Sequence, residues 1–240
     1  MELEEFKTKM TRKLDEINIQ LSESKIRDFF IYMEQLVKWN KKINLTAIVE
    51  GNEVVDKHFI DSLTISQYIN EKENVIDVGT GAGFPGIPLK IARDDLKIDL
   101  LDSLNKRINF LNEIINLLEL KNINAIHARA EDESNKKEKR EQYDVAVSRA
   151  VANLPVLLEY LLPFVKVGGK CICMKGSNID EEVNNSKKAL KELGGEIEKI
   201  DKFELPGTDA TRNIIIVRKI ANTPKKYPRK AGTATKSPII

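Results

Sequence analysis

Cysteine is scarce in this chain: its 240 residues include two, Cys171 and Cys173. A disulfide scaffold is therefore not expected, and two thiols on one face of an apolar strand are typical of a core in a reducing compartment. No apolar run reaches the roughly 18 residues of a membrane helix, because two prolines and a glutamate interrupt residues 154–165. Residues 1–5 are acidic and lack the apolar segment of a secretory signal. We therefore expect a cytoplasmic protein without a membrane segment.

Glycine and proline are also few, with 12 and 8 residues, and the chain has no internal repeat. Apolar residues make up 41% and charged residues 32% of the sequence, a composition typical of a globular protein. The length is sufficient for one sizeable hydrophobic core and a smaller annex.

Acidic residues are absent from residues 220–240, which carry five basic ones. The rest of the chain then holds 34 basic and 37 acidic residues, a net charge of −3. A basic tail on a mildly acidic body can bind a polyanion, although a solvated, disordered tail would have the same charge. We predict that the tail, residues 221–240, contacts the phosphates of a polyanion through Lys225, Lys226, Arg229 and Lys230.

Residues 1–70 show the three- and four-residue apolar spacing of amphipathic helices. One series runs through residues 3–17 and a second through 26–37, which Ser22 can cap at its N-terminus. The pattern predicts a helical annex over residues 1–70.

Short apolar runs alternate with helical segments in residues 71–220, which indicates right-handed crossovers and a parallel sheet. The expected strands are 75–78, 98–101, 125–128, 144–147 and 171–174, with helices at 87–93, 108–118 and 154–165. Two further runs, 197–205 and 213–219, are joined too closely for a crossover and must pair antiparallel. The charged stretch 132–141 is predicted to be a solvated connection. This order is the α/β, Rossmann-like layout of class I methyltransferases that use S-adenosylmethionine (AdoMet): a mostly parallel seven-stranded sheet with an antiparallel C-terminal hairpin.

A glycine-rich loop follows the first expected strand: residues 77–86 read Asp-Val-Gly-Thr-Gly-Ala-Gly-Phe-Pro-Gly. Glycines at a strand-to-helix turn let the backbone approach a ligand closely. Three of them formally match the dinucleotide fingerprint, so an NAD-dependent oxidoreductase is an alternative. Counted from Gly79, however, the third fingerprint position is Phe84, and the Asp77 carboxylate would repel a pyrophosphate. AdoMet has no phosphate and carries a positive ammonium and sulfonium, so we predict an AdoMet site that includes Asp77, Gly79, Gly81 and Gly83.

Two more acids stand where expected strands end, at the edge where open α/β sheets bind ligands. Asp102 is placed to accept hydrogen bonds from ribose hydroxyls, and its alternative role is to cap the following helix. Glu131 or a neighbouring amide can read the adenine edge, although an ordinary surface acid is the simpler interpretation. We expect Asp102→Ala to weaken AdoMet binding by about one to two powers of ten while leaving the fold intact.

The target atom is indicated by what the end of the fourth strand lacks. Residues 148–150 carry neither the Asn/Asp-Pro-Pro-Tyr/Phe tetrapeptide of amine methyltransferases nor the cysteine nucleophile of cytosine-C5 enzymes. An atom with a free lone pair, such as guanine N7, remains, and it needs no general base. His58 and His127 lack metal-ligand spacing, so we expect both to be structural and no metal to be bound.

Motifs along nearly the whole chain resemble the RsmG family, the 16S rRNA guanine-N7 methyltransferases also called glucose-inhibited division protein B (GidB). They lie at 39–40, 44–47, 58–63, 77–86, 102–107, 148–150, 175–176 and 227–233. The resemblance implies AdoMet contacts at Gly79, Phe84, Asp102, Ala130, Glu131 and Arg149. It also implies that 16S rRNA, alone or in the small ribosomal subunit, is the substrate.

The sequence therefore predicts an AdoMet-dependent enzyme that makes 7-methylguanosine in 16S rRNA by direct in-line methyl transfer. We assign no catalytic residue and expect a monomer. A non-catalytic RNA-binding protein with a vestigial cofactor fold is the second alternative, beside the NAD-dependent oxidoreductase.

Overall fold

A seven-stranded sheet forms the centre of the molecule in the computed structural model, which describes residues 1–240. The strand order is β3-β2-β1-β4-β5-β7-β6. The strands are β1 (Asn74–Val78), β2 (Lys97–Asp102), β3 (Ile123–His127), β4 (Tyr143–Arg149), β5 (Val165–Lys175), β6 (Gly195–Glu204) and β7 (Thr211–Lys219). The first five pair parallel, whereas β7 pairs antiparallel with β5 and β6. The predicted class I fold is thereby confirmed.

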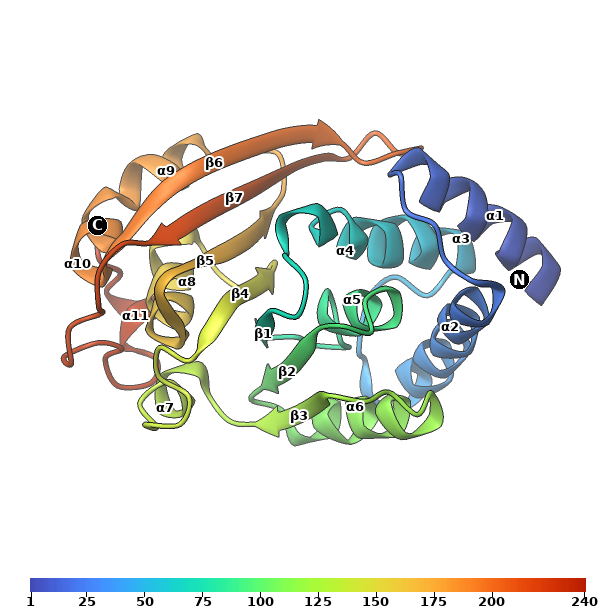
Figure 1. The fold of residues 1–240 in the computed structure, drawn as a ribbon, viewed down its shortest axis with the longest axis horizontal. Coiled ribbons are helices and arrows are strands. Elements are labelled where there is room, and N and C mark those ends of the chain that lie inside the picture. Colours follow the sequence, from blue (N-terminus) through green and yellow to red (C-terminus); the bar gives the residue numbers. More distant parts are fainter.

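Helices cover both faces of the sheet (Figure 1). On one side lie α1 (Leu3–Glu16), α2 (Glu23–Ile43), α3 (Gly51–Val54), a π-helical turn (Val55–Ile60), α4 (Asp61–Leu63), a 3-10 turn (Ser66–Tyr68), α5 (Gly86–Ala92) and α6 (Asn105–Leu117). On the other lie α7 (Ala130–Glu133), α8 (Leu154–Leu161), a 3-10 turn (Leu162–Phe164), α9 (Asp180–Asn185), α10 (Lys187–Leu193) and α11 (Thr233–Lys236). None of these helices combines the length and the apolar character needed to cross a membrane.

The strands bury both faces because consecutive side chains point to opposite sides of a sheet. Val75 belongs to a core of 37 buried residues under α1–α6, and its neighbour Ile76 to a core of 22 under α8 and α10. The first core includes Phe6 and Tyr32 of the two N-terminal helices, so the annex and the sheet share one hydrophobic core. Ser22 caps α2 as predicted, accepting a hydrogen bond from the Lys25 amide at 3.4 Å.

Two segments differ from the sequence-based elements. The helix expected over 154–165 ends at Leu161, and the chain passes through a 3-10 turn containing Pro163 into β5, which starts at Val165. Proline removes a backbone donor from the helix, which favours this exit. Helices α9 and α10 were not predicted because each is short. Helix α10 ends at Leu193, and Gly194, with a left-handed φ of +80°, follows it.

The charged stretch 132–141 is only in part the solvated connection that the sequence suggested, because Asp132 and residues 135–138 are exposed whereas the others are held against the body. Its Glu133 is 3% exposed. The Lys139 ammonium lies 2.7 Å from the Asp99 carboxylate. Arg140 donates hydrogen bonds to the carbonyls of Thr223 and Tyr227, at 2.8 and 2.9 Å. The stretch therefore ties the C-terminal tail to the body, a contact that local sequence cannot reveal.

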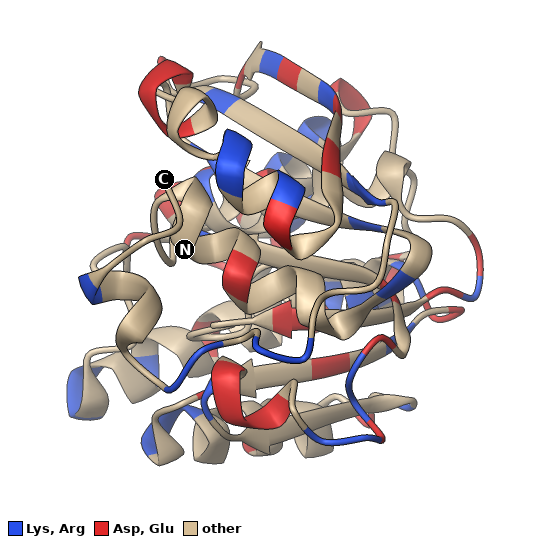
Figure 2. Ribbon diagram, turned by 90° about the vertical axis from the view of Figure 1, so that its left-hand side faces the viewer, with Lys and Arg blue, Asp and Glu red and all other residues tan.

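The C-terminal tail packs against α8 and does not extend into solvent. Tyr227 and Ile239 are each 6% exposed, and α11 contacts α8. The Arg229 guanidinium forms a two-pronged ion pair with Glu159, with contacts at 2.6 and 2.9 Å. Figure 2 shows basic and acidic residues interspersed over this side of the molecule. Of the two interpretations of the tail, the disordered one is thus excluded.

Candidate active site

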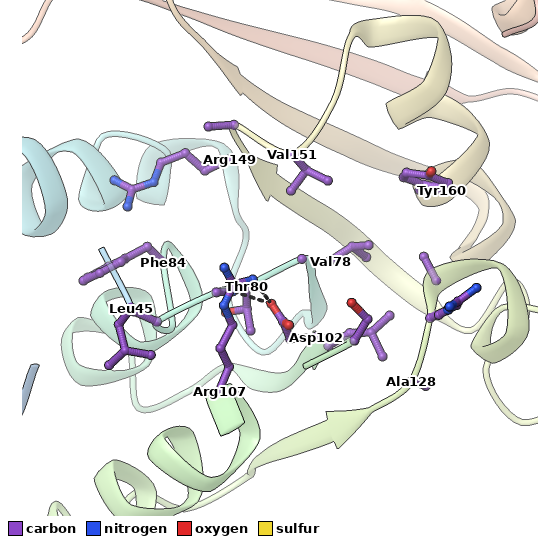
Figure 3. A pocket seen from close by; sticks show the side chains of 18 of the residues that line it. Leu45, Val78, Thr80, Phe84, Asp102, Arg107, Ala128, Arg149, Val151 and Tyr160 are labelled. Carbon is purple, nitrogen blue, oxygen red and sulfur yellow. Dashed lines mark hydrogen bonds and ion pairs between the residues drawn. The ribbon is translucent and has the colours of Figure 1, made fainter. Parts of the chain in front are cut away.

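A cavity of about 670 Å³ lies at the carboxyl ends of β1, β2, β3 and β4 (Figure 3). Its volume falls within the range of roughly 300–1,000 Å³ typical of small-molecule sites. The cavity is lined by most of the predicted cofactor residues, namely Gly79, Gly81, Phe84, Asp102, Ala130, Glu131 and Arg149. Asp77 and Gly83 do not line it.

The glycine loop lines one side of the cavity. Gly79 and Gly81 have φ of +73° and +62°, a left-handed region that disfavours side chains. A Cβ on Gly79 would lie 2.6 Å from a methyl carbon of Val151, whereas a Cβ on Gly81 would meet no atom within 4 Å. Gly79 therefore permits close packing against the opposite wall, and Gly81 leaves backbone exposed to a ligand.

Asp77 lies behind this loop and shapes it. One carboxylate oxygen accepts hydrogen bonds from the Thr80 hydroxyl at 2.7 Å and the Gly86 amide at 2.8 Å. Burial raises the pKa of Asp77 to about 7. The position of Asp77 supports a role in holding the turn. Because Asp77 does not line the cavity, it would act on a bound cation only through its charge and not by direct contact.

Gly83 serves the packing between the loop and the annex. A Cβ there would lie 2.8 Å from the Tyr32 hydroxyl and 2.6 Å from Ile87. The Tyr32 hydroxyl donates a hydrogen bond to the Ala82 carbonyl at 2.5 Å. Helix α2 can therefore press against the glycine loop only because residue 83 has no side chain.

Asp102 joins the glycine loop to α6. One of its oxygens accepts hydrogen bonds from the Gly81 amide at 3.0 Å and from Arg107 at 3.1 Å, and the other accepts one from the Leu104 amide at 2.9 Å. The carboxylate lines the cavity and is 3% exposed. These contacts contradict the expectation that Asp102 serves binding alone, because its removal would leave several donors without an acceptor.

Glu131 connects the cavity to the C-terminal tail. Its carboxylate accepts a hydrogen bond from the Gly232 amide at 2.9 Å, and Gly232 itself lines the cavity. Tyr160 of α8 also lines it, and its hydroxyl lies 3.0 Å from that of Thr235. The sequence did not place Tyr160 or Gly232 in the site, because the packing of α8 and the fold of the tail bring them there.

Arg149 lies on the opposite side of the cavity from Ala128 (Figure 3). Its guanidinium donates to the Lys57 carbonyl at 3.0 Å, the Asp61 carboxylate at 3.1 Å and Nδ1 of His58 at 3.0 Å. It also lies over the Phe84 ring, 4.9 Å from the centroid. The annex residues 57–61 therefore fix the arginine of β4.

His58 is a cavity residue that the sequence analysis treated as structural only. Its ring stacks on Phe84 with centroids 4.3 Å apart, and burial together with the Arg149 charge lowers its pKa to about 3. The ring is thus neutral near pH 7. Its π-helical turn gives no periodic signal, although such turns are frequent at functional sites.

The donors and acceptors around the cavity suit AdoMet. Exposed backbone at Gly81 and the carboxylates of Asp102 and Glu131 match the polar edges of a nucleoside, and carboxylates favour a positively charged ligand. Asp102 alone does not distinguish the cofactors, because dinucleotide sites also carry an acid for the ribose hydroxyls. The fold and this cavity define a class I AdoMet-dependent methyltransferase.

Comparison with known proteins specifies the family. The family GidB, described as rRNA small subunit methyltransferase G, matches residues 25–215. The protein of that name from Acetivibrio thermocellus is 56% identical over 222 residues, covering 92% of this chain and 91% of the relative. The one from Clostridium perfringens strain SM101 is 52% identical over 232 residues, covering 96% and 97%. The chain belongs to the rRNA small subunit methyltransferase G family, which confirms the resemblance and disfavours both alternatives.

Solved structures of lower identity share the fold. M. jannaschii TYW2 in complex with AdoMet superposes with a TM-score of 0.53 at 17% identity, covering 67% of this chain and 75% of that one. A SAM-dependent methyltransferase from Aquifex aeolicus gives 0.51 at 19% identity, covering 69% and 92%. The predicted Rossmann-like architecture agrees with these likenesses.

Proposed function

We propose that this enzyme methylates N7 of one guanine in 16S rRNA of the small ribosomal subunit. The names of its relatives give the ribosomal RNA of the small subunit as their substrate. The choice of N7 depends on one observation: beside Arg149, at the end of β4, the cavity is lined by no side chain that is free to accept a proton, and its two carboxylates, Asp102 and Glu131, follow β2 and β3, where the nucleoside of the cofactor would bind. Guanine N7 has a lone pair and no proton to lose, so it needs no such group.

His58 is the cavity residue whose chemistry comes closest to that of a base. Its Nδ1 already accepts a hydrogen bond from Arg149, and its Nε2 pairs with the Thr46 hydroxyl at 2.9 Å. Protonation is opposed by burial and by the neighbouring guanidinium, which lower its pKa to about 3. Asp102 is occupied by the donors of Gly81, Leu104 and Arg107, and arginines cannot accept a proton.

The residues that would hold the cofactor follow the lining of the cavity. Gly79 and Gly81 offer backbone, Asp102 and Glu131 offer acceptors to the nucleoside, and Phe84 and Arg149 form the remaining wall. When bound, AdoMet supplies a methyl group on a sulfonium sulfur, which leaves as a neutral thioether once the methyl carbon bonds to N7. The protein's contribution is to hold the partners in line, which can supply roughly 7–11 kcal/mol.

The substrate must present its guanine outside a regular helix. N7 lies in the deep, narrow major groove of A-form RNA, so a looped or extruded base is required. The product ring is cationic, a charge that acceptors favour as it develops, and Asp102 and Glu131 are the acids that line the cavity. We infer that a single copy of the chain acts on ribosomal RNA in the cytoplasm.

Single-turnover methylation of ribosomal RNA from a strain lacking this gene tests the proposal. We expect a rate that changes little between pH 6.5 and 8.5, and borohydride–aniline cleavage of the product at one guanine, which marks 7-methylguanosine. A tenfold rise in rate per pH unit near neutrality would reveal a general base. Methyl incorporation without cleavage at any guanine would refute the assignment to N7.

A further inference from the structure

The segment between α2 and α3 carries a cavity residue with no assigned role, Thr46. Helix α2 is stopped by Asn44, whose φ is +47°. The Asn40 side chain then accepts hydrogen bonds from the amides of Leu45 and Thr46, at 2.5 and 2.8 Å. Leu45 is buried, so the turn is held at both ends and the Thr46 side chain is fixed at the cavity wall.

The positions of the hydrogens around Thr46 follow from its partners. Arg149 has only donors, so Nδ1 of His58 must be the acceptor of their 3.0 Å hydrogen bond. The neutral ring then carries its hydrogen on Nε2 and donates it to the Thr46 hydroxyl oxygen, 2.9 Å away. The Ile48 amide donates to the same oxygen at 3.1 Å.

Both lone pairs of the Thr46 oxygen are therefore used, and its own hydrogen has no acceptor within the protein. A hydroxyl is one donor and two acceptors, so the remaining hydrogen must point away from His58 and Ile48. Because Thr46 lines the cavity, the hydroxyl presents a single, directed donor to whatever binds there.

This end of the cavity also has a positive charge. Arg149 and Arg212 both pair with the carboxylate of Asp61, at 3.1 and 2.8 Å, and His58 between Arg149 and Thr46 is neutral. Two guanidinium groups around one carboxylate leave one unit of positive charge. A fixed donor beside a positive charge suits an anionic oxygen. The acids of the cavity, Asp102 and Glu131, lie on other walls, which are formed by the residues after β2 and β3.

We infer that Thr46 donates its hydroxyl hydrogen to the methionine carboxylate of AdoMet, and that His58 is a positioning residue that directs this hydrogen. The inference depends on the proposed function, in which AdoMet occupies the cavity. It extends the cofactor site into the annex, a region to which the sequence analysis assigned no cofactor contact.

The test measures binding of two ligands by calorimetry: AdoMet, and decarboxylated AdoMet, which lacks only the carboxylate. Thr46→Val should weaken AdoMet about tenfold to a hundredfold, the range for a charged hydrogen bond, and decarboxylated AdoMet less than twofold. Thr46→Ser keeps the hydroxyl and should bind AdoMet about as tightly as the unaltered enzyme. Thr8→Val, on an exposed threonine of α1, is the matched control and should change neither ligand.

His58→Phe keeps a ring that can stack on Phe84 but removes the donor to Thr46. It should reduce the preference for AdoMet, measured as the dissociation constant of decarboxylated AdoMet divided by that of AdoMet. A general loss of stability would not change this ratio. His127→Phe, which alters the exposed histidine outside the cavity, should leave this ratio unchanged. If Thr46→Val does not fold, Thr46→Ala replaces it in the same two titrations.

Equal losses for both ligands, or no loss for either, would overturn the inference. A Thr46→Val enzyme with normal AdoMet affinity and slow methylation would also overturn it, because Thr46 would then contact the target base. These outcomes differ from failure of the proposed function, in which the unaltered enzyme would itself bind AdoMet without methylating ribosomal RNA.

Discussion

At the scale of a single residue, Asp102 combines a place on the cavity wall with a structural task. Its carboxylate borders the cavity and accepts hydrogen bonds from the glycine loop and from the start of α6. We expect Asp102→Ala to raise the AdoMet dissociation constant by about one to two powers of ten and to lower the free energy of unfolding by roughly 1–3 kcal/mol. Calorimetry and urea unfolding measure the two effects.

Asp209→Ala provides the control for this substitution, because Asp209 is an exposed loop acid. It should change neither quantity. An Asp102→Ala protein with unaltered AdoMet affinity would remove Asp102 from the cofactor site, whatever its effect on stability.

His58 makes the stability of the enzyme depend on pH. In the unfolded chain its pKa is near 6.5, and in the folded protein burial and Arg149 lower it to about 3. Between these values the unfolded state binds a proton that the folded state excludes, so stability falls as pH falls below about 6.5. Asp77 acts in the opposite sense: its raised pKa, about 7, means that stability is lost as pH rises from about 4 to 7.

The contribution of His58 can be isolated with His58→Phe. From pH 7.5 to pH 5 the parent protein should lose about 2 kcal/mol relative to this variant, because each pH unit below 6.5 costs about 1.4 kcal/mol. Urea unfolding at both pH values gives the difference, and His127→Phe, which keeps His58, should retain the loss seen in the parent. A constant difference between parent and variant would mean that His58 is not held neutral.

At the scale of the element, the C-terminal tail has two kinds of basic residue. Arg229 pairs with the fully buried Glu159, whereas Lys225, Lys226 and Lys230 are exposed. Arg229→Ala should lower the free energy of unfolding by roughly 3 kcal/mol, the lower end for a broken buried pair, since Arg229 keeps partial exposure. Its position favours this structural role over the predicted phosphate contact.

The three exposed lysines retain the prediction of RNA binding. Each phosphate contact with single-stranded RNA contributes about −0.7 to the slope of log affinity against log salt. Replacing Lys225, Lys226 and Lys230 by alanine should therefore flatten this slope by up to about 2, without changing stability. Binding titrations over a salt series measure this slope, and Lys236→Ala is the control that removes a single charge. An unaltered slope in the triple variant would show that the three lysines do not contact phosphate.

The whole molecule should unfold as one cooperative unit, because the annex and the sheet share a core. Trp39, the one tryptophan, lies in α2, packs 5.7 Å from the Phe110 ring of α6 and donates a hydrogen bond to Glu113 at 3.0 Å. Its fluorescence therefore reports on the contact between annex and sheet, and far-ultraviolet circular dichroism reports on all elements. We expect coincident urea transitions. An earlier transition in fluorescence would show that the annex unfolds separately.

Local sequence determined most of the elements and the first part of the site. Alternating apolar runs predicted the parallel strands, since a two-residue period is a property of the strand itself. The short connection near Gly207 required an antiparallel hairpin, and the glycine loop with Asp102 and Glu131 located the cofactor cavity. Each of these inferences needs only neighbouring residues and the rule that ligands bind at the carboxyl edge of a parallel sheet.

The tertiary structure decided everything that depends on residues far apart in the chain. Asp77 and Asp102 looked alike in sequence and both are buried, yet Asp77 lies behind the glycine loop and Asp102 lines the cavity. Arg229 became an internal partner of Glu159, and Gly232 reached Glu131, because the tail folds back on α8. The link from Thr46 through His58 to Arg149 spans three separate segments, and no local pattern encodes a hydrogen bond between residues that meet only when the sheet and the annex pack together.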